Sequence, residues 1–173
     1  MKLSTARRAA LVALVALAPA GPIQAAGRAE RPKLLDLTKL TYVDSHGSKS
    51  GVVLEAAEAR MLPQDEQVLM QGVALRLAAS EVRGHLEVTC DHGELDLANG
   101  SFTGVGRVRG RTPDGRRFET ERVRYDHEAG LVTTDAPVLI RDGRGTLRGG
   151  GFRYEVRQGR LKLTGGATVV QEQ

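Results

Sequence analysis

Apolar and polar residues alternate through most of the chain after residue 40. Residues 73–77 read Val-Ala-Leu-Arg-Leu, and residues 86–90 read Leu-Glu-Val-Thr-Cys. Alternation with a period of two is typical of β-strands that bury one face. The second half of the chain continues in the same way, with expected strands of about 6 to 10 residues. The pattern predicts an all-β domain.

A longer pattern recurs three times in the second half of the chain. It reads LDLANGSFTGVGRV from Leu95, YDHEAGLVTTDAPV from Tyr125 and YEVRQGRLKLTGGATV from Tyr154. Each copy begins on an apolar residue followed by an acid, passes a Gly and ends in another apolar run. A weaker copy, MLPQDEQVLMQGVAL, begins at Met61. The copies start about 30 residues apart, a spacing typical of repeated supersecondary units, so we expect a stack of β-hairpins.

Two stretches depart from simple alternation. Residues 54–61 are rich in alanine, which favours a helix, but the valines before them and the repeat both favour a strand. In residues 118–126 the inward face changes near Arg122. A β-bulge at that point would turn Val123 and Tyr125 inward.

The composition fits short strands joined by tight turns. The 173 residues are 40% hydrophobic and include 21 glycines, while aromatic residues make up 3%. This length suits one domain plus a targeting segment, and the core must be built mainly from Val, Leu and Ala. Four dipeptides predict turns because Gly tolerates the backbone angles that tight turns need: Asn99-Gly100, Asp114-Gly115, Asp142-Gly143 and Gln158-Gly159.

The first 26 residues form a segment of their own. A basic start, an apolar run over residues 9–18 and the small residues Ala18-Pro19-Ala20 resemble a secretory signal. This apolar run is much shorter than the roughly 20 residues of a membrane-spanning helix. We expect residues 1–26 to be a cleaved signal peptide or a short N-terminal membrane anchor, 27–39 a linker, and 40–173 a domain that leaves the cytoplasm.

Removal of that segment changes the charge of the chain. The formal net charge is +4, and the segment holds Lys2, Arg7 and Arg8 but no acid, so that +1 remains. The other basic residues alternate with acidic ones, and few aromatic residues are available for stacking on bases. The composition therefore predicts no binding of nucleic acid.

Three short clusters contain residue types that serve nucleophilic catalysis. For such chemistry a thiol or hydroxyl must lie beside a base that a third group orients. Adjacent residues on a strand point to opposite faces, so Cys90 and Asp91 are not expected to line one site. We interpret the acids and histidines of the clusters as polar residues at or beside turns, and Cys90 as a buried, inert thiol. The clusters are Cys90-Asp91-His92, Asp44-Ser45-His46 and Asp126-His127-Glu128.

No other motif indicates a reaction or a cofactor. The four histidines and the single cysteine follow none of the spacings of metal sites. The glycines at 104–106 and 149–151 are not followed by the Lys-Ser/Thr of a phosphate-binding loop. The sequence predicts a protein that is not an enzyme and holds neither metal nor cofactor.

The order of several short motifs resembles the LptC family, the bitopic periplasmic subunit of the lipopolysaccharide export machinery. Leu40-Thr41-Tyr42 with residues 51–56 resembles the start of the family's periplasmic domain, so the resemblance covers roughly residues 40–170. The C-terminal half carries most of it, in the order Thr120-Glu121, Tyr125-Asp126, Thr134-Asp135, Pro137-Val138, Gly149 to Gly151, Tyr154-Glu155 and Leu161.

This resemblance implies an open, twisted β-jellyroll of the kind shared with LptA, whose paired sheets enclose an apolar groove. Lipopolysaccharide would pass along the groove by its acyl chains, from the inner-membrane LptB-LptF-LptG transporter to LptA. The C-terminal strand, residues 161–170, would be the edge that meets LptA. The expected groove wall consists of Val73, Leu75, Leu77, Leu86, Val88, Val123, Tyr125, Val138, Ile140, Phe152, Tyr154, Leu161 and Leu163.

Two alternatives stay open at this point. The short N-terminal apolar run departs from the family's usual transmembrane helix, and it also suits a soluble LptA-like bridge protein. A structural or adhesive β-solenoid would bind no lipid, and the same apolar residues would then form an ordinary dry core.

Overall fold

The part of the chain that the structure describes is almost entirely β-strand. The computed structural model describes residues 34–45, 51–80, 84–143 and 145–170, and no helix occurs in these ranges. The ten strands are β1 (Leu35–Ser45), β2 (Gly51–Leu62), β3 (Gln67–Ser80), β4 (Gly84–Asp96), β5 (Phe102–Arg111), β6 (Arg117–Asp126), β7 (Leu131–Thr134), β8 (Val138–Asp142), β9 (Gly145–Glu155) and β10 (Arg160–Val170).

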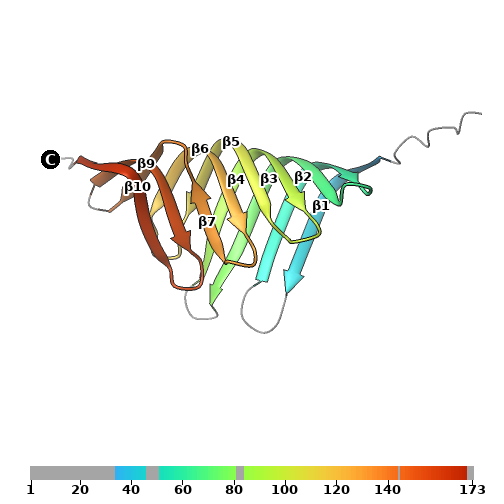
Figure 1. Cartoon of the computed structure of the whole chain (residues 1–173), viewed down its shortest axis with the longest axis horizontal. Helices are drawn as coiled ribbons and strands as arrows, with labels where there is room; N and C mark the ends of the chain where they lie inside the picture. Colours follow the sequence, from blue (N-terminus) through green and yellow to red (C-terminus); the bar gives the residue numbers. More distant parts are fainter. Residues whose placement is uncertain (1–33, 46–50, 81–83, 144, 171–173) are drawn as a thin grey trace, which may run out of the picture. The chain divides into compact units, whose positions relative to one another are not determined.

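These strands form one antiparallel sheet that follows the order of the chain (Figure 1). The order is β1-β2-β3-β4-β5-β6-β7-β9-β10, and β8 pairs with β6 and β9. Since β7 and β8 both lie between β6 and β9, the two short strands together replace one long strand. The sheet has two edges, β1 and β10. The predicted all-β fold of antiparallel hairpins is confirmed.

A line of irregular residues crosses the sheet near the middle of its strands. The strand register shifts between Thr89 and His92 of β4 and between Thr164 and Ala167 of β10. Left-handed backbone angles occur on the same line, at Lys39 (φ 58°) in β1 and Gly72 (φ 61°) in β3. Extra residues of this kind bend a strand and increase its twist.

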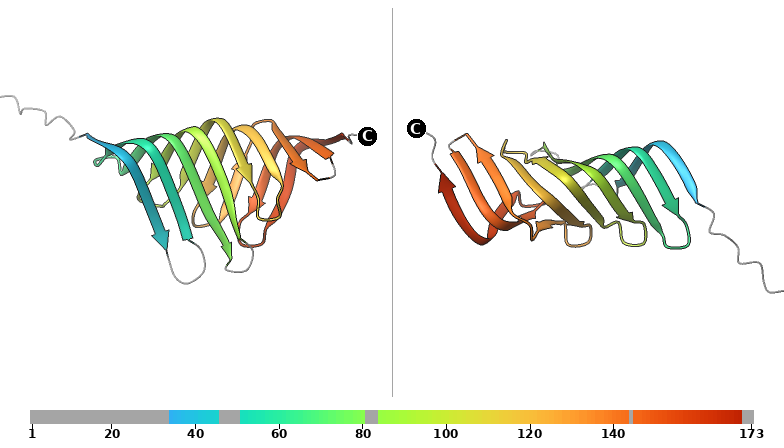
Figure 2. Two further views of the ribbon diagram at one scale, coloured as in Figure 1. Left: turned by 180° about the vertical axis from the view of Figure 1, so that it is seen from behind. Right: turned by 90° about the horizontal axis from the view of Figure 1, so that it is seen from above.

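Close approaches between neighbouring strands show that the irregular residues are continuous across the sheet. A β-carbon on Gly72 would lie 3.2 Å from the Ala57 Cβ, and one on Gly150 would lie 2.9 Å from the Gly165 carbonyl oxygen. The long strands therefore bend at the line, the link between β7 and β8 crosses it, and the single sheet folds over into two layers (Figure 2). We call residues 35–38, 58–71, 93–105, 122–134 and 152–164 the repeat layer, and residues 40–45, 51–56, 73–80, 84–90, 108–120, 138–143, 145–149 and 167–170 the facing layer.

The four repeats of the sequence are four hairpins of the repeat layer. The strand residues Met61, Leu95, Tyr125 and Tyr154 each pair with the residue seven positions further on. The fifth position after each start has a left-handed backbone, and it is Gly100, Gly130 and Gly159 in the three strong copies. In the weak copy this position is Glu66, with φ 52°. The recurring Gly is thus explained by a turn conformation that residues with a side chain adopt at a cost.

The predicted change of face in β6 is confirmed. Phe118 and Thr120 are buried before the bend, and Val123 and Tyr125 are buried after it. The cause is the register shift between Val105 and Val108 in the neighbouring β5. Residues 54–61 are strand, as predicted, within β2.

The first strand begins earlier than the alternation indicated. β1 starts at Leu35, inside the segment that was expected to be a linker. Leu37 and Leu40 both pack against the core, and the left-handed Lys39 between them breaks the period of two. The predicted signal or anchor segment, residues 1–26, lies outside the described residues. Within the described residues, no helix has the length and apolar character that crossing a membrane requires.

Candidate functional site

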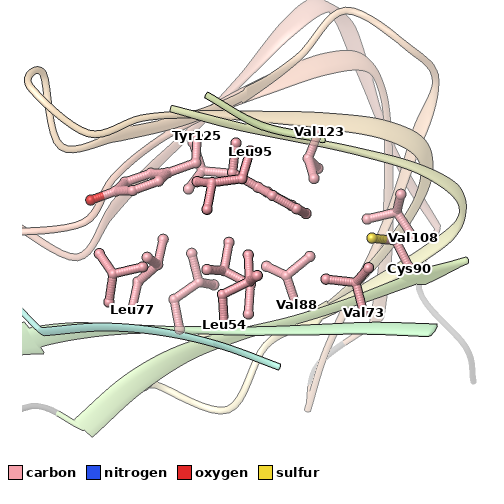
Figure 3. Packing of buried hydrophobic residues seen from close by; sticks show 14 of the residues in the cluster. Leu54, Val73, Leu77, Val88, Cys90, Leu95, Val108, Val123 and Tyr125 are labelled. Carbon is pink, nitrogen blue, oxygen red and sulfur yellow. The ribbon is translucent and has the colours of Figure 1, made fainter. Parts of the chain in front are cut away.

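The main apolar feature of the molecule is the interior between the two layers. Leu54, Leu77 and Val88 project from the facing layer toward Leu95 and Tyr125 of the repeat layer (Figure 3). Cys90 and Val108 lie at the side where the sheet bends (Figure 3). The buried side chains of the described residues are apolar except for Ser101, Thr112, Thr120 and Thr134, and none of them is charged.

The structure brings all thirteen expected groove residues together in this interior. Eleven of them are at most 4% exposed. The other two, Leu161 and Leu163 of the edge strand β10, are half-buried and pack against the same cluster. The inward side chains are almost completely shielded from water, so we expect an acyl chain to enter only where the layers move apart. Contact of these residues with lipid stays a prediction.

Several inward residues of equal burial were missing from the expected set. They include Leu54, Leu95 and Phe102, which are at most 1% exposed, and Phe118, which is 2% exposed. The repeat carried a signal for two of them, because Leu95 begins a copy and Phe102 is its cross-strand partner. The first residue of each copy and its cross-strand partner therefore identify positions that face the interior.

The interior changes in character along the sheet. Leu, Val, Ala and Met line it at β2, β3 and β4, whereas β5 to β9 contribute all the buried aromatic rings of the described residues. The rings of Phe118 in the facing layer and Phe152 in the repeat layer meet edge to face, with centroids 4.9 Å apart. Gly110 makes room for Phe118, since a β-carbon there would lie 2.0 Å from the ring. One ring contact thus connects the two layers.

Polar groups meet at the strand ends farthest from the bend. The His127 Nε2 atom, in the turn after β6, lies 3.7 Å from the Asp44 carboxylate of β1. The Tyr125 hydroxyl is 3.4 Å from His127 Nδ1, and the Tyr42 hydroxyl donates to Asp44 at 3.5 Å. Burial raises the pKa of both tyrosines. These contacts link the layers at the open rim of the interior.

The residues considered for catalysis do not assemble into a catalytic site. The buried Cys90 thiol donates to the His92 carbonyl oxygen at 3.1 Å, and burial raises its pKa to about 11. Asp91 points outward and binds Arg107 at 2.8 Å, which lowers the pKa of that carboxyl group. The expected opposite facing of Cys90 and Asp91 is confirmed.

The expectation that every histidine lies at or beside a turn is wrong for His92. This residue lies within β4 because the bend, and not a turn, interrupts the strand there. Asp126 does serve a turn, since its carboxylate accepts from the Ala129 N–H at 2.9 Å. His46 lies outside the described residues. No group of three or more His, Cys, Asp or Glu side chains suited to a metal occurs in the described ranges.

The two edge strands present apolar side chains to solvent. Val43 of β1 is 62% exposed and Val169 of β10 is 63% exposed. Each of these strands pairs with one neighbour in the sheet, and no strand among the described residues lies on its other backbone edge. Such edges accept an added strand from another chain.

The chain was also compared with known proteins. Residues 32–172 match a family model described as "Lipopolysaccharide-assembly, LptC-related". This match covers the whole sheet, from before β1 to beyond β10. Among curated proteins, none matches the chain.

Proposed function

Because the chain belongs to the LptC family of lipopolysaccharide-assembly proteins, we propose that its two layers carry lipopolysaccharide by the acyl chains. Membership in the family gives the protein a part in lipopolysaccharide export. The acyl chains would lie between the repeat layer and the facing layer, in contact with the thirteen expected groove residues. The protein would act in the periplasm, with its N-terminal segment either removed or kept as an anchor.

The observation that carries this proposal is the continuous, uncharged interior. It extends along the sheet from the half-buried Leu37 of β1 to Leu161 and Leu163 of β10. Binding of acyl chains depends on the apolar area removed from water, at about 25 cal/mol per Å², and needs few placed polar groups. An interior lined by Leu, Val, Ala and Phe meets that requirement.

The two edges of the sheet suit a relay between neighbours. We propose that the protein receives lipopolysaccharide from the LptB-LptF-LptG transporter and that β10 passes it to LptA. An added strand on β10 would extend the sheet and continue its interior into the partner. The ATPase of the transporter would supply the energy, since nothing in the described interior indicates a reaction.

A pair of neighbouring positions on β3 tests the lipid path. Leu75 is 2% exposed and points into the interior, whereas the Arg76 side chain is 50% exposed on the outer face. A photo-crosslinking residue at position 75 should capture lipopolysaccharide in cells, and the same residue at position 76 should not. Equal capture at both positions, or capture at position 76 alone, would overturn the proposal.

One observation favours the structural alternative, in which the domain binds no lipid. The inward residues fill the interior, with Leu54, Leu86 and Ile140 at 0% exposure. Under this alternative the layers never separate, and no inward position captures lipopolysaccharide even when the transporter is active. The crosslinking experiment at positions 75 and 76 therefore distinguishes the two functions.

A further inference from the structure

Four basic side chains lie together on the outer surface of the repeat layer. They are Arg122 and Arg124 of β6, Arg153 of β9 and Lys162 of β10, and all four are exposed. The strand register places Arg124 opposite Thr133, Thr133 opposite Arg153, and Arg153 opposite Lys162. Neighbouring strands are about 4.8 Å apart, so the four cations form one cluster, which we call the basic row.

The side chains of the basic row have no hydrogen bond or ion pair with any described residue. Other arginines of the sheet do have acidic partners, such as Arg107 with Asp91 at 2.8 Å and Arg141 with Glu119 at 2.7 Å. Like charges directly opposite each other on neighbouring strands destabilise a sheet. The pair of Arg153 and Lys162 breaks that rule with no compensating contact, a departure typical of functional positions.

The surface beside the basic row is hollowed. A hollow of about 520 Å³ is lined by Arg122, Arg124 and Arg153, together with residues that include Thr133 and Thr164. Asp135 is the acidic residue on its wall. Guanidinium groups bind phosphate through two parallel hydrogen bonds, and hydroxyl groups add further donors. The hollow therefore has the chemistry of a phosphate site.

We infer that the basic row binds the phosphate groups on the saccharide head of lipopolysaccharide. This inference rests on the proposed function, in which the acyl chains of the same molecule lie in the interior. Phe152 borders the hollow and is also part of the interior core, so the hollow and the interior lie on opposite faces of the same strand, β9. Because β9 is paired with strands on both sides, the charged head would reach its outer side around the turn at residues 156–159, while the chains occupy its inner side.

Charge-matched variants of the full chain test this inference. The triple variant R124Q/R153Q/K162Q removes three cations from the basic row. R109Q/R111Q/R148Q removes three exposed cations from the facing layer and serves as the control. The probes are purified lipopolysaccharide and the same lipopolysaccharide after phosphatase treatment. Each cation near an anionic head group contributes about a factor of five in affinity, so the first variant should bind lipopolysaccharide on the order of 100-fold more weakly.

The control variant should bind within about three-fold of the wild type, because its lost cations lie on the other layer. Phosphatase treatment should weaken binding to the wild type and to the control, and it should leave binding to R124Q/R153Q/K162Q unchanged. Equal wild-type binding of the two lipopolysaccharide forms would overturn the inference while the proposed function stands. An equal loss of affinity in both triple variants would also overturn the inference, because binding would then depend on the total charge of the protein and not on the basic row.

Two further results distinguish this inference from a failure of the proposed function and from binding to a membrane. If the wild type binds neither form of lipopolysaccharide, the proposed function itself fails. Vesicles of phosphatidylglycerol without lipopolysaccharide test the alternative of a membrane surface. Binding of these vesicles that depends on the basic row, without any effect of phosphatase on lipopolysaccharide binding, would assign the row to the membrane and overturn the inference.

Discussion

The two halves of the interior are built from different side chains. At β2, β3 and β4 the layers face each other through Leu, Val, Ala and Met, whereas at β5 to β9 five aromatic rings fill the space. Rings are rigid and reach further than aliphatic side chains, and Phe118 and Phe152 touch across the layers. Aliphatic side chains can repack with a smaller loss of stability. Under the proposed function, the aromatic half would fix the spacing of the layers and the aliphatic half would adapt to the acyl chains.

The largest expected effect comes from breaking the ring contact. Phe152→Ala should lower the free energy of unfolding by about 3–5 kcal/mol, because it removes a 1% exposed ring and leaves a cavity. Chemical denaturation of Phe118→Ala, Phe152→Ala and the double variant should show a coupling of about 0.5–1.5 kcal/mol. Leu77→Ala provides the comparison in the aliphatic half, and it should lower the free energy of unfolding by about 2–5 kcal/mol. No coupling between the two rings would contradict their role in joining the layers.

A smaller loss of stability is expected from a substitution at the bend, which both halves of the interior share. Gly72→Ala should destabilise the fold by about 1–2 kcal/mol, because φ is +61° and the new methyl group would lie 3.2 Å from Ala57. Gly51→Ala is the matched control in β2, since its β-carbon would meet nothing within 4 Å. Thermal unfolding measures both variants. A Gly72→Ala variant as stable as the control would show that the left-handed backbone is not required for the bend.

The smallest effect is expected at the turn between β5 and β6, at the end of the aromatic half. Hydrogen bonds from Arg116 and Thr112 lower the pKa of Asp114 from 3.8 to about 2. The carboxylate therefore stabilises the fold above about pH 4, and this contribution disappears as the pH falls toward 2. Asp114 is half exposed, so the contribution is below about 1 kcal/mol.

Denaturation as a function of pH measures this contribution. Asp114→Asn should be slightly less stable than the wild type at pH 6, and the difference should vanish near pH 2. Arg116→Gln should show a reduced dependence on pH, because it removes the main cause of the lowered pKa. A difference between Asp114→Asn and the wild type that grows as the pH falls has the wrong sign and would contradict the account.

The sequence predicted the hairpins because their signals are local. Each repeat contains its own strand residues and its own turn glycine, so that Tyr154 and Leu161 could be paired from the pattern alone. The folding of the sheet into two layers is not local. It arises from single residues such as Lys39 of β1 and Gly72 of β3, which fall on one line across β1, β2 and β3 only after the strand register is set. The early start of β1 was missed for the same reason.

The interior residues were predictable from alternation, but the contacts between them were not. Phe118 and Phe152 are 34 positions apart in the sequence, and only the fold of the sheet brings their rings together. The basic row was hidden in a similar way, because Arg124, Arg153 and Lys162 are interleaved with acids along the chain. The register of three neighbouring strand pairs aligns them on one face.

The central claim is that acyl chains lie between the two layers, and methyl NMR tests it most directly. The full chain would be labelled at the methyl groups of Leu and Val and mixed with lipid A in deuterated detergent. The account predicts nuclear Overhauser effects from acyl-chain protons to the inward methyl groups of Leu75 and Leu77, and none to the outward Leu69, which is 41% exposed. Effects confined to Leu69 and other exposed methyl groups would contradict it.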